Sequence, residues 1–417
     1  MTPVVAATTK HTVILGGNKA GIQTATTTAD GTREVTFEFN DRGRGPKLTT
    51  RIRLNQEGLP TSVQTTGNDY LKVAVKETFT LDQVTARWQN DAEKGERKLT
   101  APAFYLSLQS VPEETAILAN ALLKAKDQKL TLLPEGQAAL RKSDSTTVES
   151  PTGSPRKVTS YEISGLGFSP EVVWLNEDGS FFAAVSSWSA FILEGWEATA
   201  PKLLEIQNAR VNARMLENAK ALTRQPKGGA LAIVNANLFD SQTGKSTPGS
   251  TVLVEGNRIK AVGADGKVTI PANIERIDAR GRALLPGLAD MHVHLGEDEG
   301  VQHLAAGVTT VRDLASDTDN LLGLKKRIEA GQEIGPRIFM HGIIDGPGPF
   351  AGPTPVLVDT EAKARDAVDN YAKLGYQGIK VYSSVKPELV PAIIQRAHEK
   401  GLRVSGHVPA FMTARQF

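Results

Sequence analysis

Short apolar runs alternate with amphipathic stretches over residues 287–417, and this alternation restricts the fold of the chain more than any other feature. The apolar runs predict strands, and the stretches between them, with apolar residues at helical spacing, predict helices. The predicted strands cover residues 287–294, 308–315, 337–345, 378–384 and 403–409, and the predicted helices cover 299–306, 319–330, 361–374 and 387–400. Repeated strand–helix units build parallel sheets, so this region is predicted to form a (β/α) barrel.

Two histidines one residue apart end the first of these strands. His292 and His294 follow an apolar run that begins at Leu284. Because side chains alternate between the two faces of a strand, both rings are expected to point the same way and to bind one metal ion. Imidazole suits zinc and similar divalent ions. Taken alone, the pair also fits a second, less favoured interpretation, two histidines with structural hydrogen bonds beside a turn.

Four motifs of this region resemble the amidohydrolase superfamily, most closely its imidazolonepropionase-like and prolidase-like branch. They are Pro-Gly-Leu-Ala-Asp-Met-His-Val-His (286–294), Gly-Val-Thr-Thr-Val-Arg-Asp (307–313), Gly-Ile-Lys-Val-Tyr (378–382) and Ser-Gly-His-Val-Pro (405–409). The resemblance covers about residues 228–417. Lys380 lies 86 residues after His294, or three strand–helix units, and His407 lies 27 residues after Lys380, or one unit more. This spacing puts the three groups on the first, fourth and fifth strands, as the family requires.

The resemblance implies a site for two divalent metal ions, expected to be zinc. His292 and His294 correspond to ligands of the more buried metal, and His407 corresponds to a ligand of the second. Lys380 corresponds to a lysine that reacts with carbon dioxide to form a carbamate. The carbamate has acceptor oxygens, which an ammonium group lacks, and it can bridge both metals. Water between two cations has a lowered pKa and attacks a polarised carbonyl. The alternatives are a Lys380 paired with a carboxylate and a turn histidine at position 407.

Two further residues are predicted to bind substrate. His341 ends the third predicted strand and precedes a loop rich in glycine and proline, which in a barrel would lie over the active-site mouth. Tyr382 shares the face of Lys380 by the two-residue period of a strand. A buried strand histidine and a tyrosine packed inside the barrel are the alternatives.

The family pattern continues past residue 417. It requires three more strands, a histidine on the sixth strand and, on the eighth, the aspartate that acts as general base. None of these is present, so the catalytic base of this chain is unknown. The chain is expected to be an inactive fragment that holds the first five strands of a (β/α)8 TIM-type barrel.

The sequence before residue 284 predicts two more domains. The predicted fold class is therefore multidomain α+β and α/β. Residues 1–224 show period-two alternation and predict an antiparallel β domain that ends in a long helix. Residues 225–283 are expected to form part of the small β-sandwich of the family, and residues 284–417 the incomplete barrel. The N-terminal domain is expected either to pack against the catalytic domain or to bind an apolar ligand.

Composition narrows the classes of partner. A net charge of +2, from 48 basic and 46 acidic residues, argues against an electrostatically bound nucleic acid. The chain has no cysteine, so any metal ligands must be nitrogen or oxygen atoms. No apolar run approaches the roughly 18 residues that a membrane span needs. Amidohydrolases with a large N-terminal extension look like exported bacterial proteins, so the resemblance implies a periplasmic or secreted location, with a cytoplasmic one left open.

The sequence therefore predicts a metal-dependent hydrolase that cleaves an amide or cyclic amide C–N bond. A dipeptide or an acylated amino acid is the expected small-molecule substrate. The first alternative keeps the fold but hydrolyses a lactone or phosphoester. The second is a non-catalytic chain whose N-terminal domain binds an apolar ligand or a partner. The oligomeric state, including a homo-oligomer, stays open.

Overall fold

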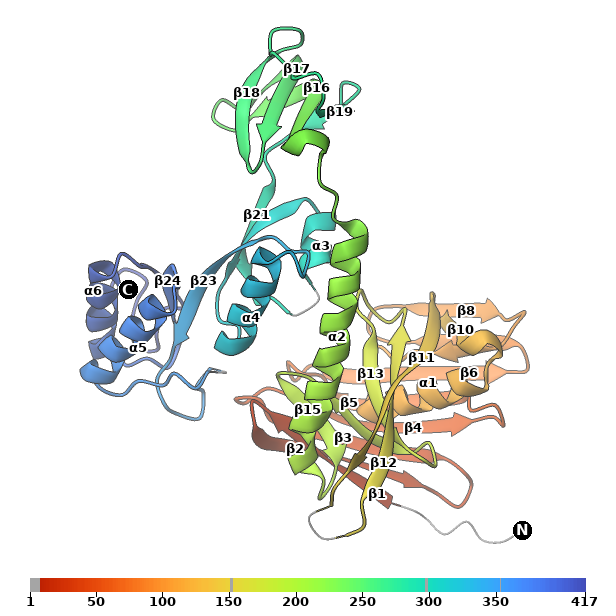
Figure 1. Ribbon diagram of the computed structural model, residues 1–417. Helices are drawn as coiled ribbons and strands as arrows, with labels where there is room; N and C mark the ends of the chain where they lie inside the picture. The colour runs from red at the N-terminus through yellow and green to blue at the C-terminus, as the bar shows by residue number, and fades with distance from the viewer. Residues whose placement is uncertain (1–7, 151–152, 297–298, 353) are drawn as a thin grey trace. The chain divides into compact units, whose positions relative to one another are not determined.

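The computed structural model describes residues 8–150, 153–296, 299–352 and 354–417 (Figure 1). The chain divides into two compact units, Met1–Val211 with Gly348–Pro353 and Asn212–Pro347 with Thr354–Phe417. Its described strands form three separate sheets, one of fifteen strands and two of five. No helix in the described part of the chain combines the length and apolar character that a membrane span requires.

The largest sheet contains all strands before residue 194. In chain order they are β1 (Thr8–Leu15), β2 (Asn18–Thr27), β3 (Arg33–Phe39), β4 (Lys47–Leu54), β5 (Pro60–Asn68), β6 (Ala74–Asp82), β7 (Thr85–Gln89), β8 (Lys94–Lys98), β9 (Ala103–Tyr105), β10 (Lys129–Leu133), β11 (Gln137–Val148), β12 (Arg156–Ser164), β13 (Glu171–Asn176), β14 (Phe181–Val185) and β15 (Ser189–Leu193). Across the sheet the order runs from β8 down to β1, then from β15 down to β9. The predicted antiparallel character is confirmed except at β9, which pairs in parallel with β10.

This sheet bends back on itself to close a core. Phe79 of β6 and Tyr105 of β9 lie near opposite ends of the strand order, yet their rings stack with centroids 4.4 Å apart. Both side chains are fully buried. The alternation of buried and exposed residues along β4, in which Leu48, Thr50 and Ile52 are buried, shows that one face of the sheet builds this core.

Helix α1 (Pro112–Lys124) covers the face formed by β11, β13 and β14 (Figure 1). It begins with proline, and the side chain of Glu114 accepts a hydrogen bond from the backbone N–H of Val111, which satisfies a free donor at the helix start. Leu118 and Leu122 are buried in the core beneath it. The helix therefore packs its apolar side chains against this face of the sheet.

A second, smaller sheet follows helix α2 (Ala200–Leu222). It consists of β16 (Ala230–Asp240), β17 (Lys245–Glu255), β18 (Arg258–Ala264), β19 (Glu275–Asp278) and β20 (Ala283–Leu284). The strand order is β18-β17-β16-β19, and β20 also pairs with β16. The four 3-10 turns of the described chain are η1 (Lys126–Gln128), η2 (Glu197–Thr199), η3 (Lys227–Gly229) and η4 (Pro387–Leu389).

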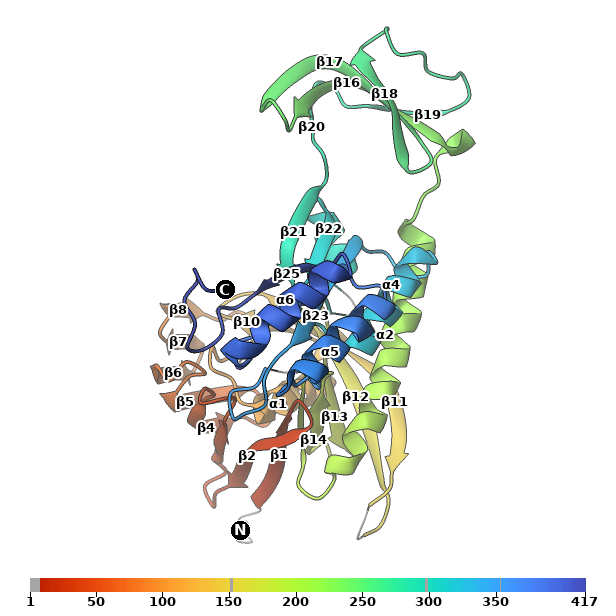
Figure 2. The same cartoon turned by 90° about the vertical axis from the view of Figure 1, so that its left-hand side faces the viewer.

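The third sheet holds the predicted strand–helix units. Its strands are β21 (Leu288–Val293), β22 (Val308–Asp313), β23 (Arg337–Ile344), β24 (Gly378–Val381) and β25 (Arg403–Gly406). The helices between consecutive strands are α3 (Gly300–Ala305), α4 (Thr318–Glu329), α5 (Glu361–Lys373) and α6 (Val390–Glu399). All neighbouring strands are parallel and follow chain order. Helices α5 and α6 lie side by side (Figure 2). The predicted alternation is thus present in the predicted order, and closure into an eight-stranded barrel stays a prediction, as do the domain boundaries.

Glycine follows each helix of these units. Gly307, Gly331, Gly375 and Gly401 all have positive φ, between 68° and 82°. A residue with a Cβ is strained in this conformation, whereas glycine adopts it freely. The glycines therefore fix where each helix stops and where the chain turns towards the next strand.

Candidate metal centre

The two faces of the parallel sheet differ in chemistry. Buried apolar side chains form the core on the helix side: Val311, Ile338, Met340, Ile344, Ile379 and Val381. The opposite face carries polar side chains together with the apolar Ile343 and Phe339. Lys380 is in register with Ile343 on one side and with Ser405 on the other, so the three side chains share this face. His341 lies two residues before Ile343 on the same face.

His292 and His294 lie on one side of the end of β21. They alternate with Val293 and Leu295, which are buried, while both histidines are exposed. Their ring centroids are 5.4 Å apart. The expectation that the two rings share a face matches this arrangement.

The buried carboxylate of Asp313 fixes the backbone that follows the two histidines. It accepts hydrogen bonds from the N–H of Leu295 at 2.8 Å and from the hydroxyl of Ser316 at 2.6 Å. Asp290 accepts a bond from the backbone N–H of His292 at 3.1 Å. Both carboxylates therefore hold the chain in place.

Lys380 is a buried lysine, with 5 % of its surface exposed. In the described part of the chain its ammonium has no hydrogen-bond or ion-pair partner. Burial lowers its pKa, and the nearby positive charge of Arg312 lowers it further. The alternative of a Lys380 paired with a carboxylate is therefore not found among the described residues.

His407 follows β25 and contacts the segment that follows Lys380. Its Nδ1 atom lies 3.2 Å from the hydroxyl oxygen of Ser383, and its ring lies 4.4 Å from that of Tyr382, centroid to centroid. Its backbone N–H donates to the carbonyl of Val381 at 3.0 Å. Tyr382, predicted to bind substrate, is thus placed beside a predicted metal ligand.

Electrostatic coupling links His292, Lys380 and His407 across the sheet. Burial lowers the pKa of both histidines, and the positive charge of Lys380 lowers each further; His292 in turn lowers that of His407.

His341 is buried beside this face. Its Nδ1 atom lies 3.2 Å from the hydroxyl oxygen of Ser405. Burial, followed by the charges of Arg312 and Lys380, lowers its pKa to about 4, so the ring is neutral at neutral pH. Its role in substrate binding stays a prediction.

Three polar residues of this face received no role from the sequence: Arg312, Ser383 and Ser405. Arg312 is in register with Phe339, and its Nε donates to the carbonyl of Met291 at 2.8 Å. The two-residue period within the predicted strands could have placed Arg312 and Ser405 on the polar face. No sequence signal marks Ser383, because it follows the end of β24 in a loop.

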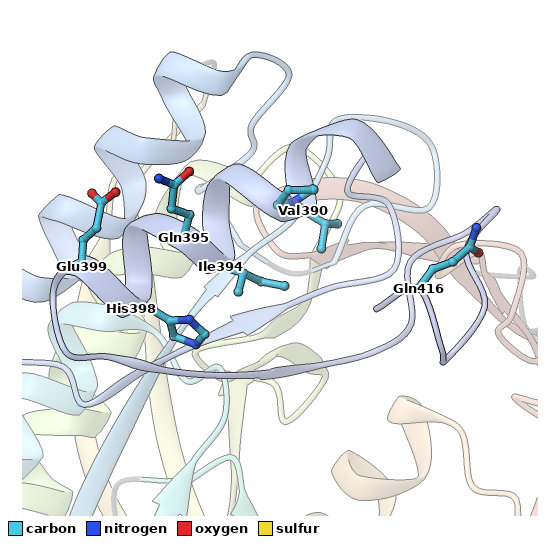
Figure 3. A pocket seen from close by; sticks show the side chains of 7 residues that line it. Val390, Ile394, Gln395, His398, Glu399 and Gln416 are labelled. Carbon is cyan, nitrogen blue, oxygen red and sulfur yellow. The ribbon is translucent and has the colours of Figure 1, made fainter.

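No group of three or more His, Asp, Glu or Cys side chains in the described part of the chain is close enough to hold a metal ion. The three histidines of the predicted ligand set, His292, His294 and His407, therefore do not form such a group in this structure. A separate hollow of about 600 Å³ lies on α6, lined by Val390, Pro391, Ile394, Gln395, His398, Glu399 and Gln416 (Figure 3). None of these residues belongs to the predicted ligand set.

No protein-family model matches the chain. Among curated proteins, it is 28% identical to adenine deaminase 3 of Rhizobium meliloti (strain 1021) over 124 residues, which are 30% of this chain and 17% of that protein. It is 37% identical to the dihydroorotase of Wolbachia sp. subsp. Drosophila simulans (strain wRi) over 100 residues, 21% of this chain and 22% of that protein. The chain thus spans about a fifth of the length of these relatives.

Two solved structures with a similar chain are molinate hydrolase and a Xaa-Pro dipeptidase with bound methionine in the active site. The first is 22% identical, with a TM-score of 0.38, over 43% of this chain and 54% of that chain. The second is 24% identical, with a TM-score of 0.37, over 43% of this chain and 57% of that chain.

Proposed function

This chain is related to the amidohydrolase superfamily, and from that relationship we propose that the protein is a metal-dependent hydrolase that cleaves an amide or cyclic amide C–N bond. The observation that supports the proposal most is the arrangement of His292 and His294. Two exposed imidazoles flank a buried valine at a strand end, with their rings turned to the same side. Neutral imidazole nitrogens in this arrangement fit a divalent metal ion such as zinc.

The proposal assigns His292 and His294 to one metal ion and His407 to a second. When bound, divalent metal ions lower the pKa of water and polarise a substrate carbonyl. Burial lowers the pKa of His292 and of His407, which favours the neutral rings whose lone pairs can bind a metal. The donor chemistry of this chain therefore fits the metals that its relationship implies.

Lys380 is proposed to become a carbamate. A neutral amine is the form that reacts with carbon dioxide, and burial beside Arg312 favours that form of Lys380. The product is an anion with two oxygens. It would give this positively charged face an acidic ligand, between His292 on one side and His407 on the other.

The proposed substrate is a dipeptide or an acylated amino acid, as in prolidase-like enzymes, or a cyclic amide, as in imidazolonepropionase-like enzymes. His341 and Tyr382 are the proposed substrate contacts. Because His341 is neutral at neutral pH, its ring is suited to exchange a hydrogen bond with an uncharged amide. Hydrolysis assays with metal-loaded protein on prolyl dipeptides, N-acyl amino acids, cyclic amides, lactones and phosphoesters separate these bond types.

Zinc titration by calorimetry tests the metal assignment. His292→Ala and His294→Ala are each expected to weaken zinc binding by more than about tenfold, since even the loss of a residue that supports a ligand costs that much. His398→Ala is the matched control, because this exposed histidine lies on α6 outside the proposed site. Equal zinc affinity in all three variants and the unmodified chain would overturn the proposal.

A further inference from the structure

We propose that residues 106–111, which connect β9 to helix α1, form a pH-dependent latch that is closed in acid and opens as the pH rises. Two buried glutamates, Glu77 of β6 and Glu114 of α1, hold this segment in place. Every residue involved lies in the N-terminal sheet, in α1 or between them, so the inference does not depend on the proposed hydrolase function.

Glu77 holds the first part of the latch. The residue is 1 % exposed, and its carboxylate accepts three hydrogen bonds. The hydroxyl of Tyr105 donates at 2.7 Å, the backbone N–H of Leu108 at 2.8 Å and the backbone N–H of Gln109 at 3.1 Å. The carboxylate thus supplies the acceptors that a neighbouring strand would supply within a sheet.

Glu114, in the first turn of α1, holds the second part of the latch. Its carboxylate accepts a hydrogen bond from the hydroxyl of Ser107 at 2.6 Å and one from the backbone N–H of Val111 at 3.1 Å. Val111 is buried in the core cluster that also contains Phe37. Four residues of the latch therefore donate to only two carboxylates, and the end of the latch in the core depends on Glu114.

Neither of these carboxylates is paired with a cation in the described part of the chain. The adjacent Glu113 differs, because a guanidinium nitrogen of Arg33 lies 2.6 Å from its Oε1 atom. The described residues of β11, β13 and β14, the strands that pack against α1, include no buried charged side chain. The titratable groups that act on Glu114 are Glu77 and the buried Tyr105, and burial raises the pKa of this tyrosine, so it stays neutral.

Burial without a cation disfavours the charged form of a carboxylate. Burial, and after it the negative charge of Glu77, raises the pKa of Glu114 from 4.5 to about 7, although two groups donate to this carboxylate. The closed latch therefore holds the proton more tightly than the open latch, in which Glu114 is in contact with water. The closed state has its full advantage below pH 4.5 and loses it as the pH rises to about 7.

The latch lies at the surface, so it can open while the sheet stays intact. Leu108, near its middle, is 48 % exposed. When Glu114 loses its proton, two carboxylates in a buried space repel each other, and release of the segment lets water reach both. Release also uncovers Tyr105 and Val111, which are buried when the latch is closed.

Hydrogen exchange of the full chain tests the inference. The protection of the amides of residues 106–111, corrected for the intrinsic exchange rate, is compared at about pH 6 and about pH 8.5. A pKa of 4.5 when open and about 7 when closed predicts that this protection falls about tenfold between the two conditions. Glu114→Gln should show equal protection at both, because glutamine does not ionise. Glu135→Gln, which removes an exposed carboxylate of the same domain, is the matched control and should show the full decrease.

Glu77→Gln is a second test, which applies even if Glu114→Gln does not fold. It removes the negative charge that raises the pKa of Glu114, so the decrease between the two conditions should be smaller than in the unmodified chain. Equal protection at both pH values in the unmodified chain, or a full decrease that persists in Glu114→Gln, would overturn the inference. Exchange of the latch only together with β4 and β5 would also overturn it, because the whole domain would then be unfolding. None of these measurements requires metal or hydrolysis.

Discussion

The ring of His341 lies in the space that a side chain at Gly378 would occupy. A Cβ atom added to Gly378 would be 2.4 Å from Cε1 of His341, well inside van der Waals contact. The two residues are directly paired across β23 and β24. Because Gly378 of β24 has no side chain, the ring of His341 on β23 can pass over it and reach Ser405 on β25.

The first prediction follows from this contact. Gly378→Ala should displace the His341 ring and destabilise the fold by about 1–3 kcal/mol, the usual cost of overpacking a buried site. Urea unfolding of the purified chain measures the change. Gly323→Ala, in helix α4, is the control and should be neutral or slightly stabilising, because alanine has the higher helix propensity. A variant at position 378 as stable as the unmodified chain would contradict the account of this contact.

The second prediction concerns carbon dioxide. Protein incubated with ¹³C-labelled bicarbonate and zinc should show one carbamate carbonyl signal in its ¹³C NMR spectrum. The signal should be absent in Lys380→Arg, because a guanidinium does not form the carbamate, and present in Lys386→Arg, which changes an exposed lysine nearby. A carbamate signal that persists in Lys380→Arg would assign the modification to another lysine.

The third prediction is a pH dependence of stability from the N-terminal domain. Burial raises the pKa of Glu114 from 4.5 to about 7, although the hydroxyl of Ser107 and the N–H of Val111 both donate to it. The folded state holds this proton more tightly than the unfolded state. The stabilisation is therefore complete below pH 4.5 and is lost as the pH rises to about 7.

The size of this loss is about 3 kcal/mol, from about 1.4 kcal/mol for each unit of pKa difference. Glu114→Gln, which cannot ionise, should flatten the stability profile between these pH values. Glu135→Gln removes an exposed carboxylate and is expected to leave the profile unchanged. Parallel profiles for the unmodified chain and Glu114→Gln would show that the carboxyl titrates normally.

The fourth prediction compares two ion pairs in the largest sheet. A guanidinium nitrogen of Arg33 lies 2.6 Å from Oε1 of Glu113, whose carboxylate is buried at the start of α1. In the second pair, which is exposed, Nε of Arg51 lies 3.0 Å from Oε1 of Glu34. Arg33→Met should cost about 3 kcal/mol because it leaves a buried carboxylate unpaired. Arg51→Met should cost less than about 1 kcal/mol. Thermal unfolding of both variants measures the stability that each loses. Equal losses would contradict the burial of the Glu113 carboxylate.

Local patterns in the sequence were sufficient to predict the parallel strands and their helices. The periods of strand and helix repeat there over short distances, and glycines such as Gly307 and Gly375 mark the helix ends. The same period placed His292 and His294 on one side of a strand end. These features depend only on residues close together in the chain.

Contacts between distant residues could not be predicted in this way. The pairing of β1 with β15 joins His11 to Leu193, and the stacking of Phe79 on Tyr105 depends on how the large sheet bends. No local period encodes either contact. The hydrogen bond between Ser383 and His407 escaped prediction for the same reason, because it joins two loops that meet only once β24 and β25 are paired.

The most direct test of the central claim is anomalous diffraction at the zinc edge from crystals of the zinc-loaded chain. The account predicts zinc bound by the rings of His292 and His294, with Lys380 and His407 as the remaining protein ligands. Zinc bound only at other residues, such as His398 beside the hollow on α6, would contradict it. Crystals in which His292 and His294 remain without metal at saturating zinc would also contradict the account.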